Sequence, residues 1–118
     1  MNSAEFVEAV KRYVRDVAVQ DVITGYLEPP GRSPSRNLVE LANWYNSLDE
    51  NESGMVNRII KESVDAGLFG FFCVLDGVRA VEEPEDRGDL RLTYINNERE
   101  ILLNDINEEY LHDLFNEQ

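Results

Sequence analysis

The stretch AGLFGFFCVLDGV, residues 66–78, is the least polar segment of the chain and holds its only cysteine and three of its seven glycines. Residues three and four positions apart share one face of a helix. An apolar stripe with this spacing runs into the stretch from the polar residues before it, and its members are Val56, Ile59, Ile60, Val64, Leu68, Phe71, Val74, Leu75 and Val78. The pattern predicts one long helix over residues 50–75, and Asp49 and Glu52 have the spacing of a capping box at its start.

Two structures compete for the end of this stretch. Asp76-Gly77, between FFCVL and VRAVE, is a strong short signal for a β-hairpin turn. Alternatively, Gly77 follows the helix in a left-handed conformation and ends it. The unbroken helical phase favours the helix, with Cys73 as a small core residue. Gly67 and Gly70 then allow another element to approach closely.

Two further helices are predicted before residue 50. Residues 3–23 have helical apolar spacing, with Ser3 as the expected N-cap, and this helix should end near residues 21–24. Gly25 and three prolines then predict a Pro/Gly-rich loop over residues 25–35. Ser35 precedes a short amphipathic helix over residues 36–48.

After Gly77 the helical periodicity gives way to short alternating segments. Residues 78–82, 90–95 and 100–104 predict a three-stranded antiparallel meander, and residues 107–115 predict a last short helix. The predicted fold is α+β, a single domain of residues 1–118 in which three N-terminal helices, the third long and central, pack on this sheet. The apolar residues expected to rest on the long helix are Val78, Ala80, Leu90, Leu92, Tyr94, Ile101 and Leu103.

The charge of the chain is strongly acidic and unevenly distributed. The formal net charge is −13, from 24 acidic and 11 basic residues. Five of each lie in residues 1–36, so residues 37–118 hold 19 acidic against six basic residues. Such a field repels nucleic acid and anionic membranes and attracts a basic partner, although acidity also serves solubility alone.

Few residues suggest catalytic or metal chemistry. Cys73 lies in the most apolar segment, where a thiol is typically inert. Glu108 and His112 lie one helical turn apart, but a single histidine makes a weak metal site and a solvated helix face is expected instead. Asp65 and Asp76 flank the apolar stretch, and each is predicted either to be a functional carboxylate or to cap a neighbouring backbone. No cofactor is expected.

Composition also indicates where the protein works. One cysteine allows no intramolecular disulfide, and the N-terminal residues lack the basic start and apolar run of a signal peptide. No stretch approaches the roughly 20 apolar residues that span a bilayer. We therefore expect a cytoplasmic protein.

The most suggestive surface feature is the segment EEPEDRGD, residues 82–89, which can offer several carboxylates to arginine and lysine side chains of a partner. Its plain alternative is a solvated turn. Trp44 falls beside the apolar stripe of its helix and is predicted to be half exposed, either as the rim of the core or as an anchor for a partner. The residues predicted to bind a partner are Glu82, Glu83, Glu85, Asp86, Asp89, Trp44 and Tyr94.

Residues 41–82 resemble a group of small bacterial proteins without an assigned activity. The likeness rests on a Trp-Tyr-Asn-Ser-Leu run at 44–48 and on a Phe-Gly-Phe-x-Cys-Val-Leu-Asp-Gly-Val run at 69–78. It implies a bacterial origin and no catalytic residues. In character the chain also resembles the immunity proteins that bacteria pair with secreted toxins, which are small, acidic and poor in cysteine.

The leading hypothesis is a non-catalytic binding protein, an acidic inhibitor or immunity-type protein that neutralises a basic partner such as a bacterial toxin. One alternative is a small enzyme or ligand-binding domain that uses Asp65 or Asp76 beside the long helix. Another is a structural subunit that forms a homodimer, and the sequence leaves monomer and homodimer equally open.

Overall fold

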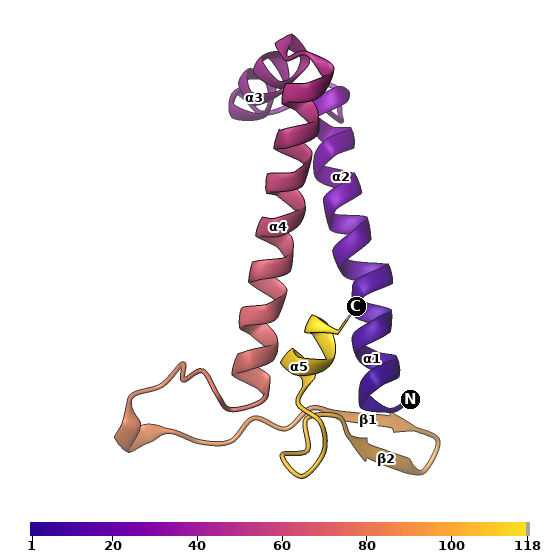
Figure 1. The fold of residues 1–118 in the computed structure, drawn as a ribbon, viewed down its shortest axis with the longest axis vertical. Coiled ribbons are helices and arrows are strands. Elements are labelled where there is room, and N and C mark those ends of the chain that lie inside the picture. The colour runs from indigo at the N-terminus through magenta and orange to yellow at the C-terminus, as the bar shows by residue number, and fades with distance from the viewer. Residues whose placement is uncertain (118) are drawn as a thin grey trace. The chain divides into compact units, whose positions relative to one another are not determined.

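The computed structural model describes residues 1–117, and its contacts divide the chain into two units (Figure 1). The terminal unit consists of Met1–Tyr13 together with the chain from Ala66 onward. The helical unit is Val14–Asp65. One boundary falls in a π-helical turn and the other falls within the long helix α4, so each unit is described separately below.

The N-terminal helix differs from the sequence prediction at both ends. α1 (Ser3–Val10) is capped by Asn2, not by Ser3, because Asn2 and Glu5 form a reciprocal capping box. A π-helical turn (Lys11–Arg15) leads into α2 (Asp16–Leu27), which runs through Gly25 and ends three residues later than expected. The Pro/Gly-rich segment therefore starts at Glu28, whose N–H still bonds to the carbonyl of Thr24.

The long helix predicted over residues 50–75 is confirmed as α4 (Glu50–Leu75). Asp49 and Glu52 form the expected capping box at its start. Gly77 ends it with a φ of +77°, and the amides of Val78 and Arg79 both bond to the carbonyl of Cys73. The alternative hairpin at Asp76-Gly77 is wrong, and Cys73 is a buried free thiol as predicted.

We expect Gly77→Ala to destabilise the terminal unit by about 1 kcal/mol, because a Cβ disfavours the left-handed region that this residue occupies. A Cβ at Gly77 would meet no atom within 4 Å, so strain and not a clash causes the loss. Urea denaturation followed by circular dichroism measures it. Gly67→Ala is the control, since Gly67 is helical and equally open, and it should be neutral or stabilising.

The predicted three-stranded meander is wrong, because the sheet has two strands in the part of the chain that the structure describes. β1 (Thr93–Asn96) pairs antiparallel with β2 (Arg99–Leu102), in a register that joins Asn96 to Arg99 across the turn. Residues 78–82 form no strand, since the chain leaves α4 there without a partner strand. Val78 and Leu90, expected against the long helix, are more than half exposed, whereas Leu103 is buried.

The core of the terminal unit joins α1, the end of α4 and the last helix. α5 spans Leu111–Asn116, so its first turn comes four residues later than predicted. It packs against α1, as Figure 1 shows. Edge-to-face and tilted aromatic contacts join Phe72 of α4 to Phe6 and Phe115. The buried cluster is Val7, Phe72, Leu111, Leu114 and Phe115.

The helical unit has a much smaller core. α3 (Arg36–Ser47) begins directly after Ser35, as predicted, is capped by the Ser35 side chain and packs against α2. The Tyr45 ring contacts Tyr26, and its hydroxyl lies 2.8 Å from Asn57 Oδ1. Nine large apolar side chains of this unit are exposed: Val14, Val17, Val22, Leu27, Val39, Leu41, Trp44, Met55 and Ile59.

In the described residues, 1–117, every helix is too short or too polar to cross a bilayer.

Candidate functional site

The candidate site is built around the segment that joins α4 to β1, residues 78–91, which we call the arm. Figure 1 shows it leaving the end of α4 and returning to the sheet, and each of its residues is exposed. Its only regular element is one 3₁₀ turn, Pro84–Asp86. Side chains and backbone of the arm are therefore open to solvent along its length.

The arm makes few hydrogen bonds of its own. Within residues 80–91 the structure shows a single backbone–backbone hydrogen bond, from Asp86 N–H to the carbonyl of Glu83. Glu82 Oε1 accepts a further bond of 3.1 Å from the amide of Gly88. Exposed segments with free amides and carbonyls are the kind of chain that partners bind in an extended form. The arm thus offers backbone groups, carboxylates and apolar side chains together.

Five of the predicted partner-binding residues lie on the arm. Glu82, Glu83, Glu85 and Asp86 occupy positions 82–86 with no basic residue among them, and we call this stretch the acidic tip. Val81, beside it, is 69% exposed. Asp89 differs, because it lies between Arg87 and Arg91 and lines a cavity with them. The negative charge of the arm is therefore concentrated at the acidic tip.

Of the two predicted aromatic anchors, Tyr94 lies in the same unit as the arm and Trp44 lies in the other unit. Tyr94 lies on β1 in the terminal unit, half-buried, and its hydroxyl accepts a hydrogen bond from Asn96 Nδ2. Trp44 lies on α3 in the helical unit and is 55% exposed, which agrees with the predicted half exposure. Because Trp44 and the arm belong to different units, Trp44 is not counted as part of the candidate site.

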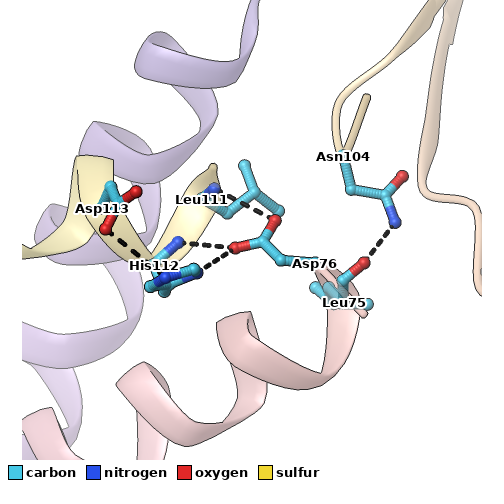
Figure 2. A network of polar contacts seen from close by, with 6 residues as sticks. All are labelled: Leu75, Asp76, Asn104, Leu111, His112 and Asp113. Carbon is cyan, nitrogen blue, oxygen red and sulfur yellow. Dashed lines mark hydrogen bonds and ion pairs between the residues drawn. The ribbon is translucent and has the colours of Figure 1, made fainter. Parts of the chain in front are cut away.

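Asn104 fixes the arm where it returns to the sheet. Its Nδ2 donates to the carbonyls of Leu75 and Leu90, at 2.6 and 2.8 Å. Its Oδ1 accepts from the amide of Leu92 at 2.8 Å. The Leu75 bond is drawn in Figure 2. One buried amide therefore joins the last turn of α4 to the end of the arm and to the segment after β2.

Asp76 makes the corresponding connection between α4 and α5. Its carboxylate, with the side chain 1% exposed, accepts the backbone amides of Leu111 and His112 at 3.1 and 2.8 Å, and it lies 2.7 Å from His112 Nδ1 (Figure 2). Since a carboxylate only accepts, the proton is on Nδ1 of the ring. The expectation that Asp76 caps a backbone is confirmed.

The His112 ring packs against aromatic side chains and is only 15% exposed. The predicted solvated helix face is therefore wrong for this residue. Tyr110 stacks on the ring and Phe69 meets it edge-on. The Nε2 atom lies 3.4 Å from Asp113 Oδ1, at the exposed side of the ring. A carboxylate that orients a histidine is a frequent part of catalytic sites, but here the pair holds the start of α5.

Asp65 belongs to the helical unit and has a different environment. Its Oδ1 lies 3.8 Å from Arg15 Nε, which is closer to Asp16 Oδ1 at 2.9 Å. Asp65 Oδ1 is buried and lacks a hydrogen-bond partner among the described residues. Asp65 contacts Arg15, whereas Asp76 contacts Leu111 and His112, so the two carboxylates share no partner.

One carboxyl near the C-terminus has a shifted pKa. A side-chain hydrogen bond with Glu117 raises the pKa of Glu109, and partial desolvation and the charges of Glu117 and Asp113 act in the same direction. Among residues 1–117, no three histidine, cysteine or acidic side chains are placed to hold a metal ion.

Sequence reasoning missed Asn104, and it considered His112 only beside Glu108, not as the partner of Asp76. Each acts on residues far away in the chain, since Asn104 binds Leu75 and His112 binds Asp76, 29 and 36 positions earlier. The one signal in the sequence was Asp76, which lies at the end of an apolar helix. A carboxylate that is buried there needs hydrogen-bond donors from elsewhere in the chain.

No family model, curated protein or solved structure matches this chain.

Proposed function

We propose that this protein is a non-catalytic binding protein, an acidic inhibitor of immunity type, whose partner is a basic protein such as a bacterial toxin. The observation that carries the proposal is the acidic tip, four carboxylates at positions 82–86 on a fully exposed arm. Its bacterial and cytoplasmic setting is part of the same proposal.

The physical basis is charge complementarity on a segment that is free to bind. In the described residues, none of the acidic-tip carboxylates forms an ion pair within 4 Å. They are therefore available to arginine and lysine side chains, which form short charge-assisted bonds with carboxylates. The net charge of −13 adds long-range attraction and speeds association with a cationic partner.

The acidic tip also lies beside apolar surface. Val78, Val81 and Leu90 of the arm are each more than half exposed. Interfaces combine a desolvated apolar centre with a polar rim, and the arm supplies both within 14 residues. Asn104 holds the two ends of this surface, because it bonds to Leu75, just before the arm starts, and to Leu90, where the arm returns to the sheet.

The test is to recover the basic partner from the native cell at low salt and to measure its affinity for matched variants. The arm variant E82Q/E83Q/E85Q/D86N removes four negative charges with little change in shape. We expect it to weaken binding by about tenfold or more, mainly through slower association, and to reduce the salt dependence of the affinity.

The control variant D21N/E28Q/E40Q/E62Q removes the same charge from exposed positions of the helical unit. It should change the affinity by about threefold or less, since distant charges contribute only screened long-range attraction. Equal losses in the two variants, or a native cell that yields no basic partner, would refute the acidic tip as the binding surface.

A further inference from the structure

The two-stranded sheet has an edge that is open to a further strand. In the described chain, β1 and β2 pair only with each other. The amide of Leu103 bonds to the carbonyl of Leu92, and in an antiparallel ladder such bonded pairs alternate with unbonded pairs. In this register Thr93 and Ile95 of β1 therefore point their N–H and C=O groups away from β2. We call these four backbone groups the open edge.

The open edge is free to form hydrogen bonds. Among residues 1–117, the backbone groups of Thr93 and Ile95 have no hydrogen-bond partner outside the sheet. Both residues are exposed, and Ile95 is 62% exposed. A two-stranded sheet is only marginally stable by itself, and a third strand adds hydrogen bonds and packing. The open edge can therefore accept a strand from another molecule.

The two edges of the sheet differ in their protection against such pairing. Proteins commonly protect edge strands with charged residues or proline. β2 has this protection, because its first two residues are Arg99 and Glu100. β1 has the sequence Thr-Tyr-Ile-Asn, which contains no charge and no proline and is rich in residue types that favour strands. We therefore expect a further strand to pair with β1.

The arm extends the open edge toward the acidic tip. It leads directly into β1 (Figure 1), and all of its residues are exposed. Asp86, at the end of the acidic tip, precedes Thr93 by seven positions. An extended chain spans this separation in roughly 23 Å, at about 3.3 Å per residue. A segment that pairs with β1 and continues past Thr93 can therefore reach the carboxylates of the acidic tip.

We propose that the open edge binds an extended segment of the basic partner as a third, antiparallel strand, and that lysine and arginine residues beyond this strand contact the acidic tip. This inference rests on the proposed function, since it describes how the same partner binds. Addition of a strand to an exposed sheet edge is a common mode of peptide recognition. The backbone bonds supply affinity, and the charges select a basic segment.

Charge identifies the occupant of the open edge. Residues 82–91 contain five acidic and two basic residues, so the chain beside the proposed strand favours a cationic segment. A second copy of this chain is disfavoured, because it would bring another net charge of −13. Antiparallel pairing is more frequent than parallel pairing, and it places the C-terminal end of the bound segment beside the arm.

The test uses the full chain and the synthetic peptide acetyl-VTVTVGRKRK-amide, in which a strand-forming half precedes a basic tail. We expect saturable binding by fluorescence anisotropy, and a scrambled peptide of the same composition should bind about fivefold or more weakly. Hydrogen exchange followed by NMR then locates the strand. Saturation with the peptide should protect the amides of Thr93 and Ile95, whereas exchange at Glu100 and Leu102, which face outward on β2, should not change.

Proline variants test the backbone bonds directly. Ile95→Pro removes an N–H of the open edge and keeps the bonds between β1 and β2, because this N–H faces away from β2. Glu100→Pro is the matched control on the other edge. We expect Ile95→Pro to weaken peptide binding about tenfold or more and Glu100→Pro about threefold or less. Ile95→Val keeps the N–H and should bind like the original chain.

Three results would overturn strand addition at β1: equal losses in the two proline variants, equal binding of the two peptides, or no binding of either peptide. Protection of Thr93 and Ile95 that rises with protein concentration without peptide would also overturn it, because a second copy would then occupy the open edge. Failure of the proposed function is a separate result, since it is decided by the native partner and the charge variants and not by backbone hydrogen bonds.

Discussion

Replacing Asn104 by alanine is expected to lower the free energy of unfolding of the terminal unit by about 3 kcal/mol. The side chain is buried, with 7% of the residue exposed, and it makes three hydrogen bonds to backbone groups. Alanine leaves the carbonyl of Leu75 and the amide of Leu92 unpaired in partly buried positions, whereas the carbonyl of Leu90 regains water. Each buried group that loses its partner costs about 1–3 kcal/mol.

Asn104→Asp sharpens this prediction. A carboxylate keeps the shape and still accepts the amide of Leu92, but it points an oxygen at the carbonyls that the amide nitrogen now bonds. It should therefore destabilise at neutral pH at least as much as alanine does. Urea denaturation and amide exchange at Leu92 measure the effect.

The control for these variants is Asn96→Ala, since Asn96 is exposed and its side chain bonds, among the described residues, only to the Tyr94 hydroxyl. It should change stability by less than about 0.5 kcal/mol. If Asn104→Ala behaves like Asn96→Ala, the three hydrogen bonds do not hold the arm to α4.

The parts of the fold that sequence reasoning predicted correctly depend on local chemistry. α4 follows from an apolar stripe that keeps one phase, from a capping box at its start and from Gly77 at its end. α3 likewise begins directly after Ser35, as predicted. These signals lie within a few residues of the element that they determine, so a single sequence contains them.

The wrong predictions concern structure that depends on distant partners. Residues 78–82 have strand-like alternation, but a strand requires a neighbour, and in the described chain β1 and β2 pair only with each other. Similarly, residues 107–110 fit a helix, yet α5 begins at Leu111, where the Asp76 carboxylate accepts its first amides. No local pattern indicates the π-helical turn at Lys11–Arg15.

The candidate sites divide in the same way. The carboxylates of the acidic tip are consecutive residues, so sequence alone identifies them. The anchor of the arm is different, because Asn104 bonds to Leu75 and Leu90, 29 and 14 positions earlier in the chain. No local pattern links these positions, and only the fold brings them together.

The largest loss of stability is expected for Asp76→Ala, about 3–5 kcal/mol. The substitution removes the acceptor of the amides of Leu111 and His112 and of the His112 ring, all at a side chain that is 1% exposed. The start of α5 then has no cap, because Tyr110 supplies no side-chain bond there. Since α5 contributes Leu111, Leu114 and Phe115 to the core, its release should disturb the packing of Phe72 as well.

Asp76→Asn and Asp113→Asn separate the role of this carboxylate from that of charge in general. An asparagine at position 76 can accept a hydrogen bond from one of the three donors, but it places its own NH₂ group against another donor. It should therefore be nearly as destabilising as alanine. Asp113, 58% exposed and 3.4 Å from the other nitrogen of His112, loses the same charge at a solvated position. Its variant should stay within about 0.5 kcal/mol of the original protein.

A double-mutant cycle then measures how much of the lost stability depends on the contact between Asp76 and His112. His112→Ala leaves Asp76 with two backbone amides, so it should cost less than Asp76→Ala, and the double variant should be little worse than Asp76→Ala alone. Amide exchange at Leu111 and His112 reports α5, whereas the fluorescence of Trp44, the only tryptophan, reports the helical unit. Strictly additive losses would mean that Asp76 and His112 act separately, and that α5 is held by its apolar contacts with α1 and Phe72 instead.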